Sequence, residues 1–222
     1  MSNDKSKTAD DLIGQLCNDL DTTGAASKKC GTFCAFRHIA PWIIICFAYA
    51  LIAIKYWGLR HDFDEVMYNP IFVFDMGLAF AIFIVAAIAS SYFTLPDQGQ
   101  KTWIKTIPMT LVSVFLFWSL TKAHAQGFDW PSIQYGVRCV EKGMYMEILP
   151  IISIMALCTR GHTTQPYWLI SMNVLAVVAI GWIILRLTCS IDDAAHNFIY
   201  QILPFAIIGA GLGFFARKLF RW

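Results

Sequence analysis

One short stretch near the end of the chain gathers side chains that could bind a metal ion. Cys189 is followed closely by Asp192, Asp193 and His196, which places a thiol, two carboxyl groups and an imidazole near one another in sequence. Transition metals accept all three kinds of ligand, and thiolates favour the softer ions. We therefore interpret Cys189 and His196 as candidate metal ligands and a transition-metal ion as a candidate signal, while the sequence establishes no cofactor.

The elements that position these side chains are predicted to be membrane-spanning helices. Of 222 residues, 57% are hydrophobic and 14% are charged, and the mean hydropathy is +0.55, outside the range of soluble globular domains. About 20 apolar residues of helix cross a bilayer. Six apolar runs qualify: 39–57, 71–95, 107–120, 144–158, 168–187 and 198–215. They lack the alternation of barrel strands, so we expect an all-α polytopic membrane protein, a bundle of about six transmembrane helices.

The distribution of Lys and Arg predicts which side of the bundle is cytoplasmic. Six spans place both termini on one side, and short cytoplasmic loops carry an excess of basic residues. The larger basic set is Lys5, Lys7, Lys28, Lys29, Arg37, Lys101, Lys105, Arg160, Arg217, Lys218 and Arg221. The smaller set is Arg60, Lys122, Arg138, Lys142 and Arg186. We expect a bacterial inner-membrane protein with both termini in the cytoplasm, residues 1–38 forming a cytoplasmic arm and residues 39–222 the transmembrane domain.

The net charge and the first 37 residues limit the classes of partner that we expect. The formal net charge is only +2, so no basic field points to direct binding of nucleic acid. Residues 1–37 are polar and lack the apolar core of a cleavable signal peptide, so we expect the arm to remain attached. The lipid bilayer and a protein bound by the arm are the expected partners.

Cys139 and Cys189 are the two of seven cysteines that this topology places on the outer side. In an oxidising compartment two accessible thiols can form a disulfide or, when reduced, bind a soft metal ion or become oxidised. The sequence leaves both states open. Cys30, Cys34 and His38 also recur at helical spacing, but three ligands make an incomplete structural zinc site. We interpret these two cysteines as reduced cytoplasmic thiols.

The arm begins with apolar residues at helical spacing. Leu12, Leu16 and Leu20 form one stripe, with Ile13 beside it. Since a lone helix this short is marginal in water, it needs a partner or the membrane surface to become ordered. A leucine stripe with no soluble core beside it is typical of a helix that binds in the groove of another protein. The alternative is an ordinary cytoplasmic tail.

Three charged residues fall inside the predicted spans. Lys55, Asp75 and Glu147 lie near the outer ends of the first, second and fourth spans. Charges at such depth usually face the bundle interior or a polar cavity, although each could also extend singly to the interface. Their shared depth leads us to hypothesise an intramembrane polar cluster lining a vestibule beside Cys139 and Cys189.

Glycines in the last predicted span indicate helix packing. Gly209, Gly211 and Gly213 follow no strand, which argues against a nucleotide-binding loop. Gly209 and Gly213 have the small-xxx-small spacing that lets transmembrane helices approach closely.

Taken together, these residues resemble the NrsF family of membrane anti-sigma factors, the negative regulators of sigma F. The likeness is carried by the Leu12 to Leu20 segment, the six spans, the stretches Gly136 to Cys139 and Cys189 to His196, and an ending with Gly209, Gly213, Arg217, Leu219, Arg221 and Trp222. The resemblance implies that the arm binds an extracytoplasmic-function sigma factor and holds it off RNA polymerase. It also implies that Cys139 and Cys189 take part in sensing metal or oxidative stress, which makes Asp192, Asp193 and His196 further sensor candidates.

Two other classes of membrane protein are less consistent with the sequence. A thiol-disulfide oxidoreductase commonly uses a Cys-x-x-Cys pair, and this chain contains no such spacing. A small transporter would be expected to show inverted repeats or broken helices in matching positions, and none is evident. We therefore expect a regulator and no enzyme activity.

Overall fold

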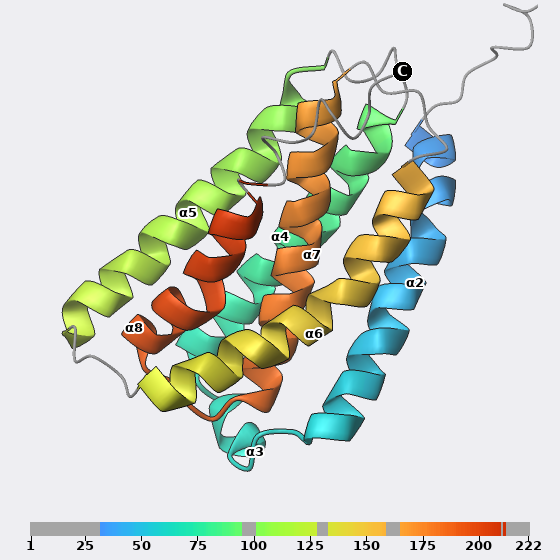
Figure 1. The fold of residues 1–222 in the computed structure, drawn as a ribbon. Helices are drawn as coiled ribbons and strands as arrows, with labels where there is room; N and C mark the ends of the chain where they lie inside the picture. The colour runs from blue at the N-terminus through green and yellow to red at the C-terminus, as the bar shows by residue number, and fades with distance from the viewer. Residues whose placement is uncertain (1–31, 95–100, 128–132, 159–164, 210, 212–222) are drawn as a thin grey trace, which may run out of the picture. The chain divides into compact units, whose positions relative to one another are not determined.

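The computed structural model describes residues 32–94, 101–127, 133–158, 165–209 and 211, and all of its regular elements in this part are helices. The elements are α2 (Thr32–Trp57), α3 (Phe63–Val66), α4 (Pro70–Phe93), α5 (Trp103–Gln126), α6 (Ile133–Cys158), α7 (Pro166–Thr188), α8 (Ala194–His196) and the π-helix η2 (Asn197–Ile202), as Figure 1 shows. Residues 203–209 continue as α-helix. The chain divides into two units, Met1–Ala35 and Phe36–Trp222, and the second contains the helical bundle.

The centre of this bundle is the pair α4 and α7. Helix α5 packs on α4, and α6 packs on α7, with α8 and η2 lying between α5 and α6 (Figure 1). Small buried residues at the central contact include Ala86 of α4 and Ala176 of α7, and such residues let helices approach closely inside a membrane. The Ser90 hydroxyl of α4 also donates a hydrogen bond to the side chain of Asn173 in α7.

Local sequence explains where several helices begin and end. Asn69 caps α4, because its side chain accepts a hydrogen bond from the Ile71 N–H at 3.0 Å, and a proline occupies the first turn. Gly58 and Gly127 follow α2 and α5 with φ of +79° and +83°. These left-handed conformations favour glycine and end each helix.

Helix α2 is attached to its neighbours by side chains. The Trp42 indole N–H donates to the Pro150 carbonyl of α6 at 3.1 Å, and the Tyr49 hydroxyl donates to the Tyr145 carbonyl at 2.6 Å. The Trp42 ring also packs on Phe83 of α4, with 5.7 Å between the ring centroids. Because α2 follows the N-terminal residues directly, these contacts connect the start of the bundle to α6.

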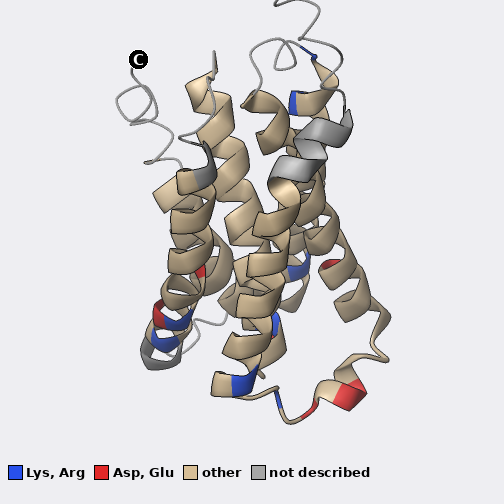
Figure 2. Ribbon diagram, turned by 90° about the vertical axis from the view of Figure 1, so that its right-hand side faces the viewer, with Lys and Arg blue, Asp and Glu red and all other residues tan. Residues whose placement is uncertain are grey.

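The expectation of an all-helical fold is confirmed for the described residues, and the lengths and compositions of its helices are those of membrane spans. Four helices are long and apolar enough to cross a membrane: 39–57, 70–93, 103–126 and 166–188. Large apolar side chains on them point outward, such as Leu51 and Phe117, which are 69% and 71% exposed. Such exposure is unfavourable in water but suits contact with lipid. Charged residues gather toward the end of the bundle that carries α3 (Figure 2).

The expected count of six spans is not established by the described residues. Helix α6 is long, but it begins well before the predicted span 144–158 and carries Arg138, Glu141 and Lys142 in its first half. The last apolar helix covers 194–209, where we predicted a span over 198–215. Helix α5 likewise extends beyond 107–120 at both ends. Apolar runs mark only the lipid-facing part of a helix, so they do not report its polar ends. The predicted arm helix lies outside the described residues.

Candidate metal and thiol site

Two cysteines from different helices meet at one end of the bundle. Cys139 lies on α6 and Cys189 caps the end of α7, and their Sγ atoms are 3.6 Å apart, a hydrogen-bonding distance between free thiols. His196 of α8 completes the group. One ligand atom from each of these three residues lies within 4.8 Å of the other two. The structure therefore brings together the candidates Cys139, Cys189 and His196.

His196 is enclosed by protein, and neither of its ring nitrogens makes a close hydrogen bond with the described residues. A buried imidazole nitrogen without a partner is unfavourable, because it loses its bonds to water and gains none in return. The ring packs beside Tyr200, with 5.1 Å between centroids. Asp193 caps α8 by accepting a hydrogen bond from the His196 backbone N–H at 3.0 Å, which holds the residue in place.

Two glycines on α6 allow the close approach of η2 and of the α-helix that continues from it. A Cβ atom at Gly136 would lie 2.2 Å from the ring of Tyr200 in η2, and one at Gly143 would lie 2.4 Å from the ring of Phe205 in the following helix. No side chain fits at either position without movement of its neighbour. Cys139 follows Gly136 by about one helical turn, so the glycine contact sets how near His196 and Tyr200 come to the thiols. The π-helix begins directly after His196, and such segments are frequent at functional sites.

The two thiols titrate as a coupled pair. The hydrogen bond from the Cys139 thiol lowers the pKa of Cys189, and the neighbouring His196 lowers it further, against the opposing effect of burial. The same hydrogen bond, together with burial, raises the pKa of Cys139. One proton is thus held between two sulfurs while the other is lost more readily than from an ordinary thiol. A thiolate is both the nucleophile and the metal ligand form of cysteine.

The arrangement fits a soft metal ion. A tetrahedral ion with metal–sulfur bonds of 2.3 Å holds two sulfur ligands about 3.8 Å apart, close to the separation seen here. Two thiolates and one imidazole match the donor preferences of zinc and other borderline-soft ions. Three protein ligands leave a fourth position for water or another ligand.

Two of the predicted sensor residues, Asp192 and Asp193, make contacts outside the thiol group. Asp192 binds Arg60 and Arg186, with O to N distances of 2.5 and 2.8 Å. Asp193 caps α8. The three ligand atoms that the structure brings together come from Cys139, Cys189 and His196.

The hypothesised intramembrane polar cluster of three charged residues is not formed by the described contacts. Asp75 accepts hydrogen bonds from Trp118 and Lys122 of α5. Lys55 is exposed on α2, and Glu147 packs against Gly181 of α7. Each charge has a different surrounding, because the helix faces, and not depth alone, decide which side chains meet.

The remaining predicted residues are only partly described. Gly209 lies against α7, where a Cβ atom would be 2.5 Å from the Val174 side chain, whereas Gly213 is outside the described residues. The partner-binding candidates Leu12, Ile13, Leu16 and Leu20 are also outside them. The sequence did not indicate that Arg60 and Arg186 form ion pairs near the thiol site, and we used them only to predict orientation. The basic residues near the acidic Asp62 and Asp192 in sequence were the pattern that could have indicated these pairs.

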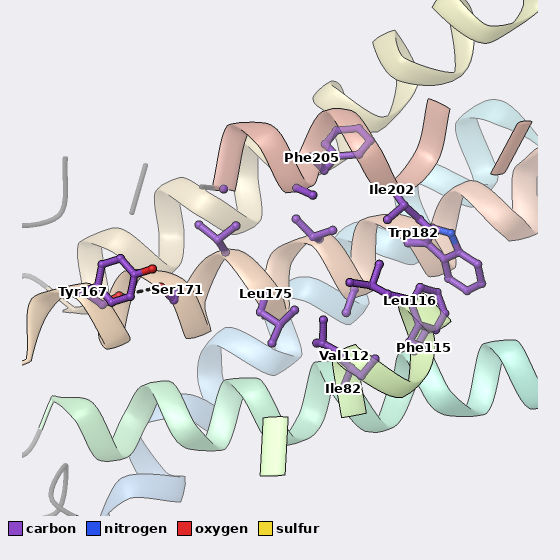
Figure 3. Close-up of a pocket in the computed structure, with 16 residues that line it drawn as sticks. Ile82, Val112, Phe115, Leu116, Tyr167, Ser171, Leu175, Trp182, Ile202 and Phe205 are labelled. Atoms are coloured by element: carbon purple, nitrogen blue, oxygen red, sulfur yellow. Dashed lines mark hydrogen bonds between the residues drawn. The ribbon is translucent and has the colours of Figure 1, made fainter. Parts of the chain in front are cut away.

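A separate apolar cavity of about 240 Å³ lies between α4, α5, α7 and the last helix (Figure 3). Its lining includes Phe115, Leu175, Trp182 and Phe205, and none of the described residues that line it is charged. The three clustered ligand candidates are not part of this lining. The thiol site and this cavity are therefore separate.

A family model described as NrsF, negative regulator of sigma F, matches residues 30–222. The chain belongs to the NrsF family. The predicted resemblance to that family is confirmed, and the matched range contains the whole bundle. The NrsF match begins at residue 30. The Leu12 to Leu20 segment therefore lies outside the match, and its predicted part in the resemblance is not supported by it. The family description makes a sigma factor the partner. Comparison with curated proteins and with solved structures found no significant match.

Proposed function

We propose that this NrsF-family protein is an inner-membrane anti-sigma factor that binds an extracytoplasmic-function sigma factor through its N-terminal arm. It releases the factor when Cys139 and Cys189, facing the periplasm, react with a metal ion or an oxidant. It acts as a regulator and not as an enzyme. The observation that carries the sensing part is the group of Cys139, Cys189 and His196, whose ligand atoms lie within 4.8 Å of one another.

Either signal changes the distances within this group. A metal ion binds two thiolates and the neutral imidazole, so the thiol protons leave as the ion enters. An oxidant instead takes two electrons and two protons from the pair, and the sulfur atoms move from 3.6 Å to the bonded distance of about 2.05 Å. Because the sulfurs belong to α6 and α7, both reactions change the contact between those helices.

The arm supplies the binding part of the proposal. The stripe of Leu12, Leu16 and Leu20 offers an apolar face for a groove on the sigma factor. The excess of Lys and Arg on the side of both termini favours a cytoplasmic arm, where the factor is found. Release then needs two bundle states that differ in affinity for the factor, and a tenfold difference takes only about 1.4 kcal/mol.

The test uses the full chain, its sigma factor and a reporter fused to a target promoter in the same cells. Cys139→Ser with Cys189→Ser is expected to keep repression but to lose induction by metal ion and oxidant. His196→Asn is expected to weaken the response to metal ions more than the response to oxidants, because only metal binding uses the imidazole. Leu16→Asp is the positive control for release: it should raise promoter activity without inducer and abolish co-purification with the factor.

Two results would contradict the proposal. Normal induction of the double cysteine variant would remove the thiols from sensing. Undiminished co-purification of the Leu16→Asp variant with the sigma factor would remove the leucine stripe from binding.

A further inference from the structure

The loop from Cys189 to Asp193 is attached to the segment that follows α2. The Ser190 hydroxyl lies 3.2 Å from the Nδ1 atom of His61. The backbone N–H of Arg60 donates to the Leu187 carbonyl, in the last turn of α7, at 3.0 Å. Residues on each side of Cys189 therefore contact the chain just beyond the end of α2.

Asp192, in the middle of this loop, is held between two arginines. Its carboxylate accepts hydrogen bonds from Arg60 Nη1 and Nη2 at 3.0 and 2.5 Å. It also lies 2.8 Å from Arg186 Nη1 of α7. Burial alone would raise the pKa of Asp192, but the hydrogen bond from Arg60 and the charges of both arginines lower it, so the group stays ionised. Bidentate arginine–carboxylate pairs are among the stronger and more directional polar contacts.

The arginines themselves are fixed by their surroundings. The side chain of Arg60 is fully enclosed and that of Arg186 is 5% exposed, whereas the Asp192 side chain is 45% exposed. Both guanidinium groups lie over the Phe72 ring of α4, at 5.6 and 5.1 Å from its centroid. Asp62 also binds Arg60 from within the same segment, at 2.7 Å. Separation from Asp192 would leave the buried guanidinium of Arg186 without a carboxylate from the described residues, whereas Arg60 would keep its pair with Asp62.

Space for movement is present beside this bridge. A cavity of about 340 Å³ is lined by Phe72, Lys122, Arg186, Asp192 and Asn197, among others. The loop and the bridge therefore border space that is not filled by packed side chains.

We propose that Arg60, Asp192 and Arg186 are positioning residues that carry a change at Cys189 to the end of α2, and so to the arm that α2 follows in the chain. The bridge deepens the proposed function and rests on it, since it has a role only if the thiols sense and the arm binds. Displacement of Cys189 moves Asp192, three residues away in a short loop, and Asp192 pulls on Arg60. The hydrogen bonds from α2 to α6 at Trp42 and Tyr49 then let the helix respond to α6 and α7 together.

The experiment measures two quantities in the same cells carrying the full chain, its sigma factor and a promoter reporter. Alkylation followed by a gel shift reports whether Cys139 and Cys189 react with added oxidant, and the reporter gives the release. Arg60→Gln and Asp192→Asn are expected to leave thiol oxidation and basal repression unchanged while induction falls by about tenfold. Asp192→Glu keeps the charge and is expected to restore part of the induction.

Asp62→Asn is the matched control, because it removes a partner of Arg60 from the same segment and leaves the bridge to Asp192. It should induce normally. If Arg60→Gln fails to accumulate in the membrane, Asp192→Asn decides, since the half-exposed Asp192 side chain tolerates an amide. Wild-type induction, or release without inducer, in a variant present at the wild-type level overturns the bridge. Induction that survives Cys139→Ser with Cys189→Ser instead overturns the proposed sensor, which separates the two failures.

Discussion

At the scale of single residues, the unusual group is the buried imidazole of His196 beside two thiols. Neither of its nitrogens makes a close hydrogen bond with the part of the chain that the structure describes, and one ligand nitrogen lies within 4.8 Å of the sulfurs of Cys139 and Cys189. An ion bound there would satisfy one nitrogen and both sulfurs at once. The same neighbours make Cys189 a stronger acid than an ordinary cysteine, and this has a measurable consequence in the absence of any metal ion.

Cys139→Ala is expected to slow the alkylation of Cys189 at neutral pH. The thiol of Cys139 lowers the pKa of Cys189 by donating a hydrogen bond to its thiolate. Without this donor the pKa rises toward the ordinary value of about 8.5, and the reactive fraction at pH 7 falls. Peptide mapping after iodoacetamide treatment from pH 5 to 9 should show the variant's profile moved to higher pH. Cys139→Ser, which keeps a hydroxyl donor, should lie between the two, and superimposed profiles for Cys139→Ala and the wild type would contradict the coupling.

At the scale of elements, the site depends on how closely η2 lies against α6. Gly136 and Gly143 of α6 present no side chain to the rings of Tyr200 in η2 and Phe205 in the α-helix that continues from it, so α6 meets these rings through its backbone. The cap at Asp193 starts α8 and sets the direction in which η2 leaves the loop. The thiol site is thus held by packing between elements and not by a single motif.

Gly136→Ala is expected to disturb the site from a distance. Its Cβ atom would lie 2.2 Å from the Tyr200 ring, so η2 must move and take His196 with it. Overpacking of this kind costs about 1–3 kcal/mol of folding free energy. Thermal unfolding in detergent should show a lower Tm, and titration with cobalt(II), followed by its thiolate absorption, should show affinity weaker by about tenfold. Gly77→Ala on α4 is the control, since nothing lies within 4 Å of a Cβ there, and equal effects of the two changes would remove the packing argument.

At the scale of the whole molecule, the proposed function needs the thiols of Cys139 and Cys189 and the N-terminal arm on opposite sides of one membrane. The described helices make a bundle with an apolar surface, and charged residues collect toward the end that carries α3 and the loop of Cys189. The arm is attached to the other end of α2 in sequence. The excess of Lys and Arg near the termini predicts which side is which.

An impermeant maleimide is expected to label Cys189 in intact spheroplasts, because the residue is partly exposed at the end predicted to face outward. Cys46, which is fully buried within α2, should remain unlabelled and serves as the internal control. When fused at the N-terminus, a reporter that works only in the cytoplasm should be active, and one that works only in the periplasm should be inactive. If Cys189 is labelled only in permeabilised membranes, or if the N-terminal reporter proves to be periplasmic, the predicted orientation is wrong. Sensing across the bilayer is then contradicted.

The sequence by itself determined that the chain is a helical membrane protein, because long apolar runs have few stable solutions outside a bilayer. It also predicted Cys189 and His196 as candidate ligands of one metal ion, because they lie in one short loop and the helix that follows. The predicted topology placed Cys139 on the same side as Cys189, but only the tertiary structure decided that their sulfur atoms lie 3.6 Å apart, although 50 residues separate them in sequence, and that Asp192 binds Arg60. Such contacts depend on which faces of α6 and α7 pack together. Hydrophobic periodicity identifies an apolar face of a helix, but it does not identify the helix face that packs against it.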